Sequence, residues 1–296
     1  MALTLFFLSS NDNKARDEII YAFKHPDTGQ EYQIIHAYKL YDNYENRLKE
    51  NPSISPSQVF EEVVIEPIYD ACFRDAEYST EAIDFPDDLK QVSNLVKKME
   101  EEKINNVVRE ALIKSSNYIP SSKMTNVCVF PSKVDYDLPF MFTSGSGKIS
   151  VLYDKNTDEE MLRVGIAHEY HHSVWTEKYF NKESSMTVLD NIVLEGKAVM
   201  FEKVVYPNLT FTEVNYRYDK EDWEKIEQDL YLYDDYRAYE ILYGGEGLPE
   251  NYGYIEGYKM VRSFLDLQPN LTPEDWTALS AEEVFEEGNY LEYYKE

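Results

Sequence analysis

Apolar side chains recur every three or four residues along much of the chain, and this spacing predicts mainly helices. The spacing holds over 35–48 and over 56–68, and it extends through the charged stretch 86–115, which we expect to be one long helix. No internal repeat or low-complexity linker interrupts this part of the sequence. We therefore predict a helical region for residues 1–120.

The pattern changes after Pro120, where short β-rich runs replace the helical spacing. A Ser-Gly-Ser-Gly sequence at 144–147 separates two of these runs and predicts a hairpin turn. We therefore expect a small antiparallel sheet, with Lys148–Tyr153 as an edge strand along which a substrate could pair its backbone. The three predicted strands are 126–130, 140–143 and 148–153.

Two further helices are predicted at about 157–178 and 186–203, and an acidic, tyrosine-rich helical region follows them. This order of elements predicts an α+β, mostly helical fold in which the small sheet packs on the helix at 157–178. We predict three regions, namely helices at 1–120, a core at 121–205 and a helical region at 206–296 that completes a cleft.

The charge of the chain excludes some classes of partner. Acidic residues outnumber basic ones 56 to 29, and the formal net charge of -27 disfavours nucleic acid and anionic lipid because the field repels phosphate. No run of 18 apolar residues is present, so no membrane-spanning helix is predicted. A basic peptide, in contrast, would be attracted by such a field.

The compartment stays open between the cytoplasm and export from the cell. The apolar start Met1–Leu8 has no Lys or Arg before it and no A-x-A-like site after it, so we expect a first strand or a disordered end in preference to a signal peptide. Cys72 and Cys128 are too few for a disulfide-dense scaffold. We expect two buried free thiols, since a bond would require Cα atoms within about 7 Å of each other.

Three of the five histidines lie within the sequence His168-Glu169-Tyr170-His171-His172, which fits H-E-x-x-H. His168 and His172 lie on the apolar stripe of the predicted helix, and an i,i+4 pair places two imidazoles side by side, as zinc requires. Glu169 stands about 100° around the helix from His168, which suits a base that deprotonates a water. Two core histidines are the structural alternative. His171 follows His168 by three residues and could compete as a ligand, but we expect it to support a ligand or to lie at the surface.

A catalytic zinc ion usually has three protein ligands and one open position. A third histidine six residues after His172 is one known arrangement, but that position is Lys178. The other arrangement takes a glutamate from the next helix, where Glu195 lies on an apolar stripe and needs a compensating cation. Glu177 and Glu183 are rival ligands, and a solvated surface role is the structural alternative for Glu195.

Residues near Glu195 are expected to support the site. Asp190 and Asn191 lie about one turn earlier and could hydrogen-bond a ligand imidazole, although helix capping is an equal alternative for Asp190. Gly196 and Ala198 are small enough to let this helix approach the H-E-x-x-H helix closely.

These motifs resemble those of the gluzincin metallopeptidases, and in particular a bacterial group of predicted zinc-dependent proteases described mainly as a domain of unknown function. The resemblance rests on the H-E-x-x-H sequence, on Leu189-Asp190 and on Glu195-Gly196-Lys197-Ala198, and it covers roughly 55–290. It is strongest over 140–205, and Tyr252–Val261 is similar to the C-terminal helix of that group. The resemblance implies a zincin-like fold with one Zn²⁺ per chain, held by His168, His172 and Glu195, with Glu169 as the base.

The expected function is therefore hydrolysis of a peptide or protein substrate by a zinc-activated water. In gluzincins a Tyr or His from the C-terminal part commonly donates to the oxyanion, and no histidine follows His172 here. Tyr254 and Tyr258 share a helical stripe, and we favour Tyr254. Two rival functions are a zinc amidase or esterase with a non-protein substrate, and a degenerate zincin that acts as a binding protein; the intact Glu169 argues against the latter.

Overall fold

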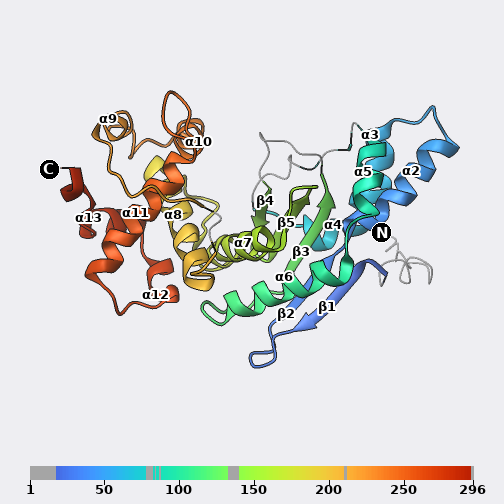
Figure 1. The fold of residues 1–296 in the computed structure, drawn as a ribbon, viewed down its shortest axis with the longest axis horizontal. Helices are drawn as coiled ribbons and strands as arrows, with labels where there is room; N and C mark the ends of the chain where they lie inside the picture. Colours follow the sequence, from blue (N-terminus) through green and yellow to red (C-terminus); the bar gives the residue numbers. More distant parts are fainter. Residues whose placement is uncertain are drawn as a thin grey trace, which may run out of the picture. The chain divides into compact units, whose positions relative to one another are not determined.

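The computed structural model describes residues 18–77, 83, 85–86, 88–132, 140–209 and 212–294, so the expectation for Met1–Leu8 lies outside the described residues. The chain divides into two compact units, each made of two separate segments. Unit 1 comprises Met1–Arg109 and Ser122–Asp158, and unit 2 comprises Glu110–Ser121 and Glu159–Glu296. Unit 1 contains the sheet, and unit 2 is helical (Figure 1). The fold is α+β and mostly helical, as predicted.

Unit 1 is built on a five-stranded sheet (Figure 1). The strands are β1 (Ile20–Lys24), β2 (Glu31–Ile35), β3 (Thr125–Pro131), β4 (Met141–Gly145) and β5 (Lys148–Tyr153). Their order in the sheet is β1-β2-β3-β5-β4. The outer pairs are antiparallel, whereas β2–β3 and β3–β5 are parallel. The sheet is therefore mixed, and the prediction of an antiparallel sheet is wrong, because β5 inserts beside β3 in the parallel sense.

Strand β5 lies inside the sheet and not at its edge. Ile149 is paired with Val127 of β3 on one side and with Thr143 of β4 on the other. Because both neighbours occupy its backbone hydrogen-bonding groups, β5 cannot also pair with a substrate strand. The prediction that Lys148–Tyr153 is an edge strand is therefore wrong. The predicted hairpin at 144–147 is confirmed, since β4 and β5 are antiparallel neighbours joined there.

The helices of unit 1 match the apolar spacing in part. Helices are present within 35–48 and 56–68, as predicted, but the single helix expected at 86–115 is two helices. The chain turns between them, where the N–H groups of Lys98 and Met99 donate to the carbonyls of Leu95 and Val96. These elements are the 3₁₀ helix η1 (Ala37–Leu40), α2 (Tyr41–Glu50), α3 (Pro56–Phe60), the π-helical turn η2 (Glu61–Ile65), α4 (Glu66–Cys72), α5 (Leu89–Val96) and α6 (Glu101–Ser116).

A disulfide joins Cys72 to Cys128 in the core of unit 1, so the prediction of two free thiols is wrong. The Cα atoms are 6.1 Å apart, within the range that a disulfide requires. Cys72 ends α4 and Cys128 lies in β3, and both are buried among apolar side chains that include Phe60 and Phe130. The bond thus links a helix to the sheet across this core.

Unit 2 is a set of helices around one central helix. They are α7 (Glu159–Tyr179), α8 (Val188–Val205), α9 (Lys220–Trp223), α10 (Asp235–Tyr243), α11 (Tyr252–Leu267), α12 (Pro273–Ala278), α13 (Ala281–Glu287) and the 3₁₀ helix η3 (Tyr290–Tyr294). Helix α8 packs against α7, α10, α11 and α13. The segment Glu110–Ser121 joins this unit, and the carbonyl of Ile119 accepts the hydroxyl of Tyr170 at 3.0 Å. The predicted helices at 157–178 and 186–203 correspond to α7 and α8.

Glycines set the distance between α8 and α11. A Cβ atom on Gly196 would lie 2.0 Å from the carbonyl carbon of Gly257, and one on Gly257 would lie 2.0 Å from the carbonyl oxygen of Ile192. No side chain fits at such distances, so the two backbones touch directly. Gly196 therefore allows close approach to α11, and not to the H-E-x-x-H helix as predicted.

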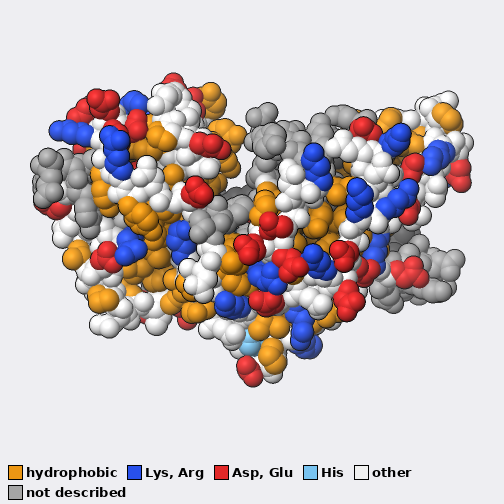
Figure 2. Space-filling model, viewed as in Figure 1, with side chains coloured by type: hydrophobic (Ala, Val, Ile, Leu, Met, Phe, Trp, Pro, Cys, Tyr) orange, Lys and Arg blue, Asp and Glu red, His pale blue; other side chains and the backbone are white. Residues whose placement is uncertain are grey.

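The visible surface of both units carries acidic and basic side chains among apolar ones (Figure 2). Within the described ranges, no helix combines the length and the apolar character that crossing a bilayer would require.

Candidate metal centre

Helices α7 and α8 bring His168, His172 and Glu195 together. The two imidazoles lie one turn apart on α7, with ring centroids separated by 4.8 Å, and Glu195 faces them from the second turn of α8. Oε2 of Glu195 lies 3.2 Å from Nε2 of His168 and 3.1 Å from Nε2 of His172. The two Nε2 atoms are 3.1 Å apart. Three donor atoms therefore form a nearly equilateral triangle.

This triangle fits a zinc ion. Tetrahedral ligands about 2.0–2.1 Å from zinc lie roughly 3.3 Å from one another, close to the spacing observed here. Two imidazoles and one carboxylate are also a donor set that zinc prefers in proteins. Among the residues that the structure describes, this is the one group of His, Cys, Asp and Glu donors close enough to hold an ion.

His168 is buried, His172 and Glu195 are half-buried, and the charges of the three depend on one another. Burial alone would lower the pKa of His168, but its hydrogen bonds to Glu195 and Glu202 outweigh burial and raise that pKa well above its ordinary value. Burial alone would raise the pKa of Glu195, but the neighbouring imidazoles outweigh it and lower that pKa. The carboxylate of Glu195 is thus held ionised inside the protein by the two neighbouring imidazoles.

Glu202 supports His168 from the other side of the imidazole ring. Its Oε2 lies 3.4 Å from Nδ1 of His168, and its Oε1 accepts the backbone N–H of Thr212 at 3.2 Å. The side chain is almost fully buried, at 1% exposure. Glu202 follows Glu195 by seven residues, which places both on one face of α8. Sequence reasoning missed this residue, although an acidic residue two turns after Glu195 in an apolar helix was a usable signal.

Asp190 and Asn191 serve the start of α8. The carboxylate of Asp190 accepts the backbone N–H and the hydroxyl of Thr187, and the amide of Asn191 donates to the carbonyl of Thr187. This is a capping box, so the capping alternative holds for Asp190. Glu202 occupies the supporting position that was predicted for these two residues.

Glu169 and Tyr254 lie near the donor triangle. Glu169 is buried, and its charge acts on His168, Tyr243 and Tyr254, so it faces this part of unit 2. The ring of Tyr254, in the first turn of α11, lies 6.2 Å from that of His168. Its hydroxyl donates to that of Tyr243 at 3.3 Å, and burial raises its pKa well above the ordinary value. Tyr254 is therefore a protonated donor beside the cluster.

Tyr258 and His171 are turned to other partners. The hydroxyl of Tyr258 accepts a hydrogen bond from Arg262, and its ring contacts Tyr216. His171 is fully buried, with its ring stacked 5.7 Å from Trp276 of α12, so it is not at the surface. Burial lowers the pKa of His171 well below its ordinary value, so it is a neutral core residue.

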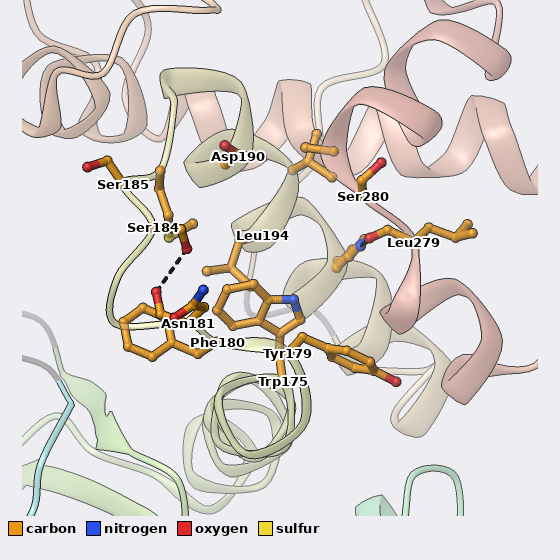
Figure 3. A pocket seen from close by; sticks show the side chains of 14 residues that line it. Trp175, Tyr179, Phe180, Asn181, Ser184, Ser185, Asp190, Leu194, Leu279 and Ser280 are labelled. Atoms are coloured by element: carbon orange, nitrogen blue, oxygen red, sulfur yellow. Dashed lines mark hydrogen bonds between the residues drawn. The ribbon is translucent and has the colours of Figure 1, made fainter.

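A cavity of about 260 Å³ lies at the end of the hairpin formed by α7 and α8 (Figure 3). Trp175 and Tyr179 line it from α7, and Lys197 lines it from α8. The ammonium of Lys197 donates to the carbonyl of Leu279 at 2.6 Å, and burial lowers its pKa to about 8. Lys197 points away from the face of α8 that carries Glu195, because two residues turn a helix by about 200°. The cavity is therefore beside the cluster and not part of it.

A largely buried His-His-Glu donor set on two adjacent helices defines a candidate mononuclear metal centre. A family model described as predicted Zn-dependent protease (DUF2268) matches residues 96–286, and the chain belongs to this family. The matched range contains all of α7, α8 and α11. Comparisons with curated proteins and with solved structures find no match. The family agrees with the resemblance that the motifs indicated.

Proposed function

We propose that the protein is a zinc-dependent peptidase in which His168, His172 and Glu195 bind one Zn²⁺. The observation that carries the proposal is the donor triangle, with sides of 3.1–3.2 Å. The family description supports the choice of metal and of reaction class. Zinc in such a site supplies Lewis acidity, which lowers the pKa of a water and polarises a carbonyl group.

Three side chains around the triangle have separate roles in the proposed reaction. Glu169 accepts the proton of the attacking water and passes it to the amine that leaves. The hydroxyl of Tyr254 donates a hydrogen bond to the carbonyl oxygen of the substrate as negative charge develops there. Glu202 accepts from Nδ1–H of His168 and so directs the other ring nitrogen toward the triangle.

Metal analysis and proteolysis together test this proposal. The purified protein should contain about one zinc per chain and should cleave casein until a chelator is added. Glu169→Gln should abolish cleavage and retain the zinc, because only the base is removed. His168→Ala and Glu195→Ala should lose the zinc.

Glu183→Gln is the matched control, since Glu183 is an exposed glutamate in the turn between α7 and α8. It should keep both zinc and activity. Full zinc occupancy in Glu195→Ala would reject Glu195 as a ligand. Zinc-loaded protein that cleaves no peptide bond would reject the peptidase activity.

A further inference from the structure

The rings of Tyr239, Tyr243 and Tyr254 form a continuous row that ends at the candidate metal centre, and Tyr236 lies one turn further out on α10. Tyr236, Tyr239 and Tyr243 lie at positions i, i+3 and i+7 of α10, on one face of that helix. The ring centroids of Tyr239 and Tyr243 are 4.6 Å apart, and those of Tyr243 and Tyr254 are 5.8 Å apart. The ring centroid of Tyr254 in turn lies 6.2 Å from that of His168. We call these four residues the tyrosine row.

The tyrosine row is exposed at its outer end and becomes buried toward the centre. Tyr236 is 72% exposed, Tyr239 is 55% exposed and Tyr243 is 41% exposed, while Tyr254 is half-buried. Apolar and acidic side chains lie beside one another on the surface over α10 (Figure 2). Scattered exposed aromatics are common, but contiguous ones that lead into a site are typical of a binding surface.

The surroundings of the tyrosine row are strongly acidic. The segment 229–250 contains six acidic residues and one basic residue, Arg237. The guanidinium of Arg237 is paired with Asp229, Glu240 and Glu246, so it does not offset the remaining carboxylates. Aromatic faces next to carboxylates attract Lys and Arg side chains, both through cation–π contact and through the local field.

We propose that the tyrosine row binds the substrate, and that it selects an extended polypeptide with Lys or Arg on one side of the bond to be cleaved. The inference rests on the proposed peptidase function, because it names the substrate of that site. The path from Tyr239 through the rings to His168 is at most about 17 Å, which an extended chain crosses in about five residues. The basic residues should therefore lie within about five positions of the cleaved bond.

Cleavage of a mixed peptide library tests the selectivity, with the products identified by mass spectrometry. The zinc-loaded protein should enrich Lys and Arg on one side of the cleaved bonds. The double variant Tyr236→Ala/Tyr239→Ala should lose that enrichment and cleave basic peptides about five-fold or more slowly, since each exposed cation–π contact changes binding by a few-fold. Its zinc content should not change. Tyr216→Ala removes a tyrosine outside the row that is 59% exposed, and it should retain the enrichment.

A binding measurement separates this inference from the proposed function. Glu169→Gln protein should bind a fluorescent Lys-rich peptide more tightly than a matched Glu-rich peptide, as measured by anisotropy. The double change at Tyr236 and Tyr239, added to Glu169→Gln, should weaken the Lys-rich complex about five-fold or more. Zinc-dependent cleavage without preference for basic peptides would overturn the inference and leave the function intact. Preferential binding without any cleavage would reject the function and support the tyrosine row as a binding surface. If the double variant Tyr236→Ala/Tyr239→Ala retains the preference for basic peptides, as Tyr216→Ala should, the inference is overturned, because the net charge alone would then explain the preference.

Discussion

The carboxylate of Glu202 lies 3.4 Å from Nδ1 of His168, while Nε2 of the same ring lies 3.2 Å from Glu195. Two acidic residues of α8 therefore hold opposite edges of one imidazole. Glu202→Gln should lower the affinity for zinc about 10–100-fold, because the ring loses its negatively charged acceptor and keeps at most a weaker, neutral one. Competition with a chelator of known affinity measures the change. Asp190→Asn is the control, since Asp190 caps α8 and should affect stability without affecting zinc affinity. Equal zinc affinity in Glu202→Gln and wild type would show that Glu202 does not support zinc binding.

Tyr254→Phe removes the hydroxyl nearest the cluster and keeps the ring. We expect kcat to fall about 10²–10³-fold, with zinc content unchanged, because the developing negative charge loses a donor. Tyr258→Phe is the matched control, one turn further along α11, where the hydroxyl is bonded to Arg262. It should stay within about two-fold of wild type, as expected for a side chain away from the reaction. A similar loss of kcat in both variants would mean that α11 as a whole, and not the hydroxyl of Tyr254, matters.

Gly257→Ala places a methyl group against the backbone of α8, about 2.0 Å from the carbonyl oxygen of Ile192. The helices must separate, and we expect the free energy of unfolding to fall by about 2–3 kcal/mol or more. Gly245→Ala is the control, since its nearest contact would be 3.3 Å from Cβ of Glu240. Thermal unfolding of both variants checks the prediction. Wild-type stability in Gly257→Ala would show that α8 and α11 are less tightly packed than described.

Cys72→Ser/Cys128→Ser should destabilise unit 1. The disulfide closes a loop with a sequence separation of 56, for which chain entropy alone gives about 4 kcal/mol of stabilisation. Thiol alkylation before and after reduction, followed by mass analysis, tests whether the bond forms. Zinc content should not change, because all proposed ligands lie in unit 2. Two freely alkylated thiols in the unreduced native protein would contradict the bond.

His36 should make unit 1 less stable in acid. Burial lowers the pKa of His36 to about 4, against about 6.5 in the unfolded chain, although Glu101 lies 3.7 Å away and opposes the shift. Between these pH values the unfolded state binds more protons, so the free energy of unfolding falls as the pH is lowered from 6.5 to 4. The loss is about 3 kcal/mol across the window.

His36→Gln removes this titration. Urea unfolding at pH 7 and at pH 4.5 should therefore show a smaller drop in stability for the variant than for the wild type. The carboxylates that titrate in this range are present in both proteins, so their contribution cancels in the comparison. An equal drop would show that His36 is protonated in the folded protein at pH 4.5.

The sequence predicts the cluster well because the motif is local. His168 and His172 need only one helix to come together, and Glu195 needs only the next helix and a short turn. The role of Glu202 was harder to predict, since its contact with His168 depends on how α7 packs on α8, and helical spacing alone does not reveal that packing. The prediction of which helix packs against Gly196 was wrong for the same reason.

The sheet depends on pairing between distant segments, and this is where prediction failed. The order of β3, β5 and β4 cannot be derived from the alternation of residues within each strand. The bend between α5 and α6 has no Gly or Pro to mark it. Strands β1 and β2 lie within 1–120, so the prediction of a purely helical region there is wrong. The sequence did indicate them, because His25-Pro-Asp-Thr-Gly29 between two β-rich runs is typical of a hairpin, and Gly29 has a φ of 75°.

Unit 2 takes residues 110–121 from the middle of unit 1, so the backbone passes between the units three times. During synthesis the carbonyl of Ile119 emerges before strands β3–β5, and its partner Tyr170 emerges after them. The proposed catalytic centre therefore cannot mature on the ribosome until the last strand of the other unit has been made. A gene fragment that starts at Glu159 would encode every proposed ligand and still lack part of the support for the helix that carries two of them.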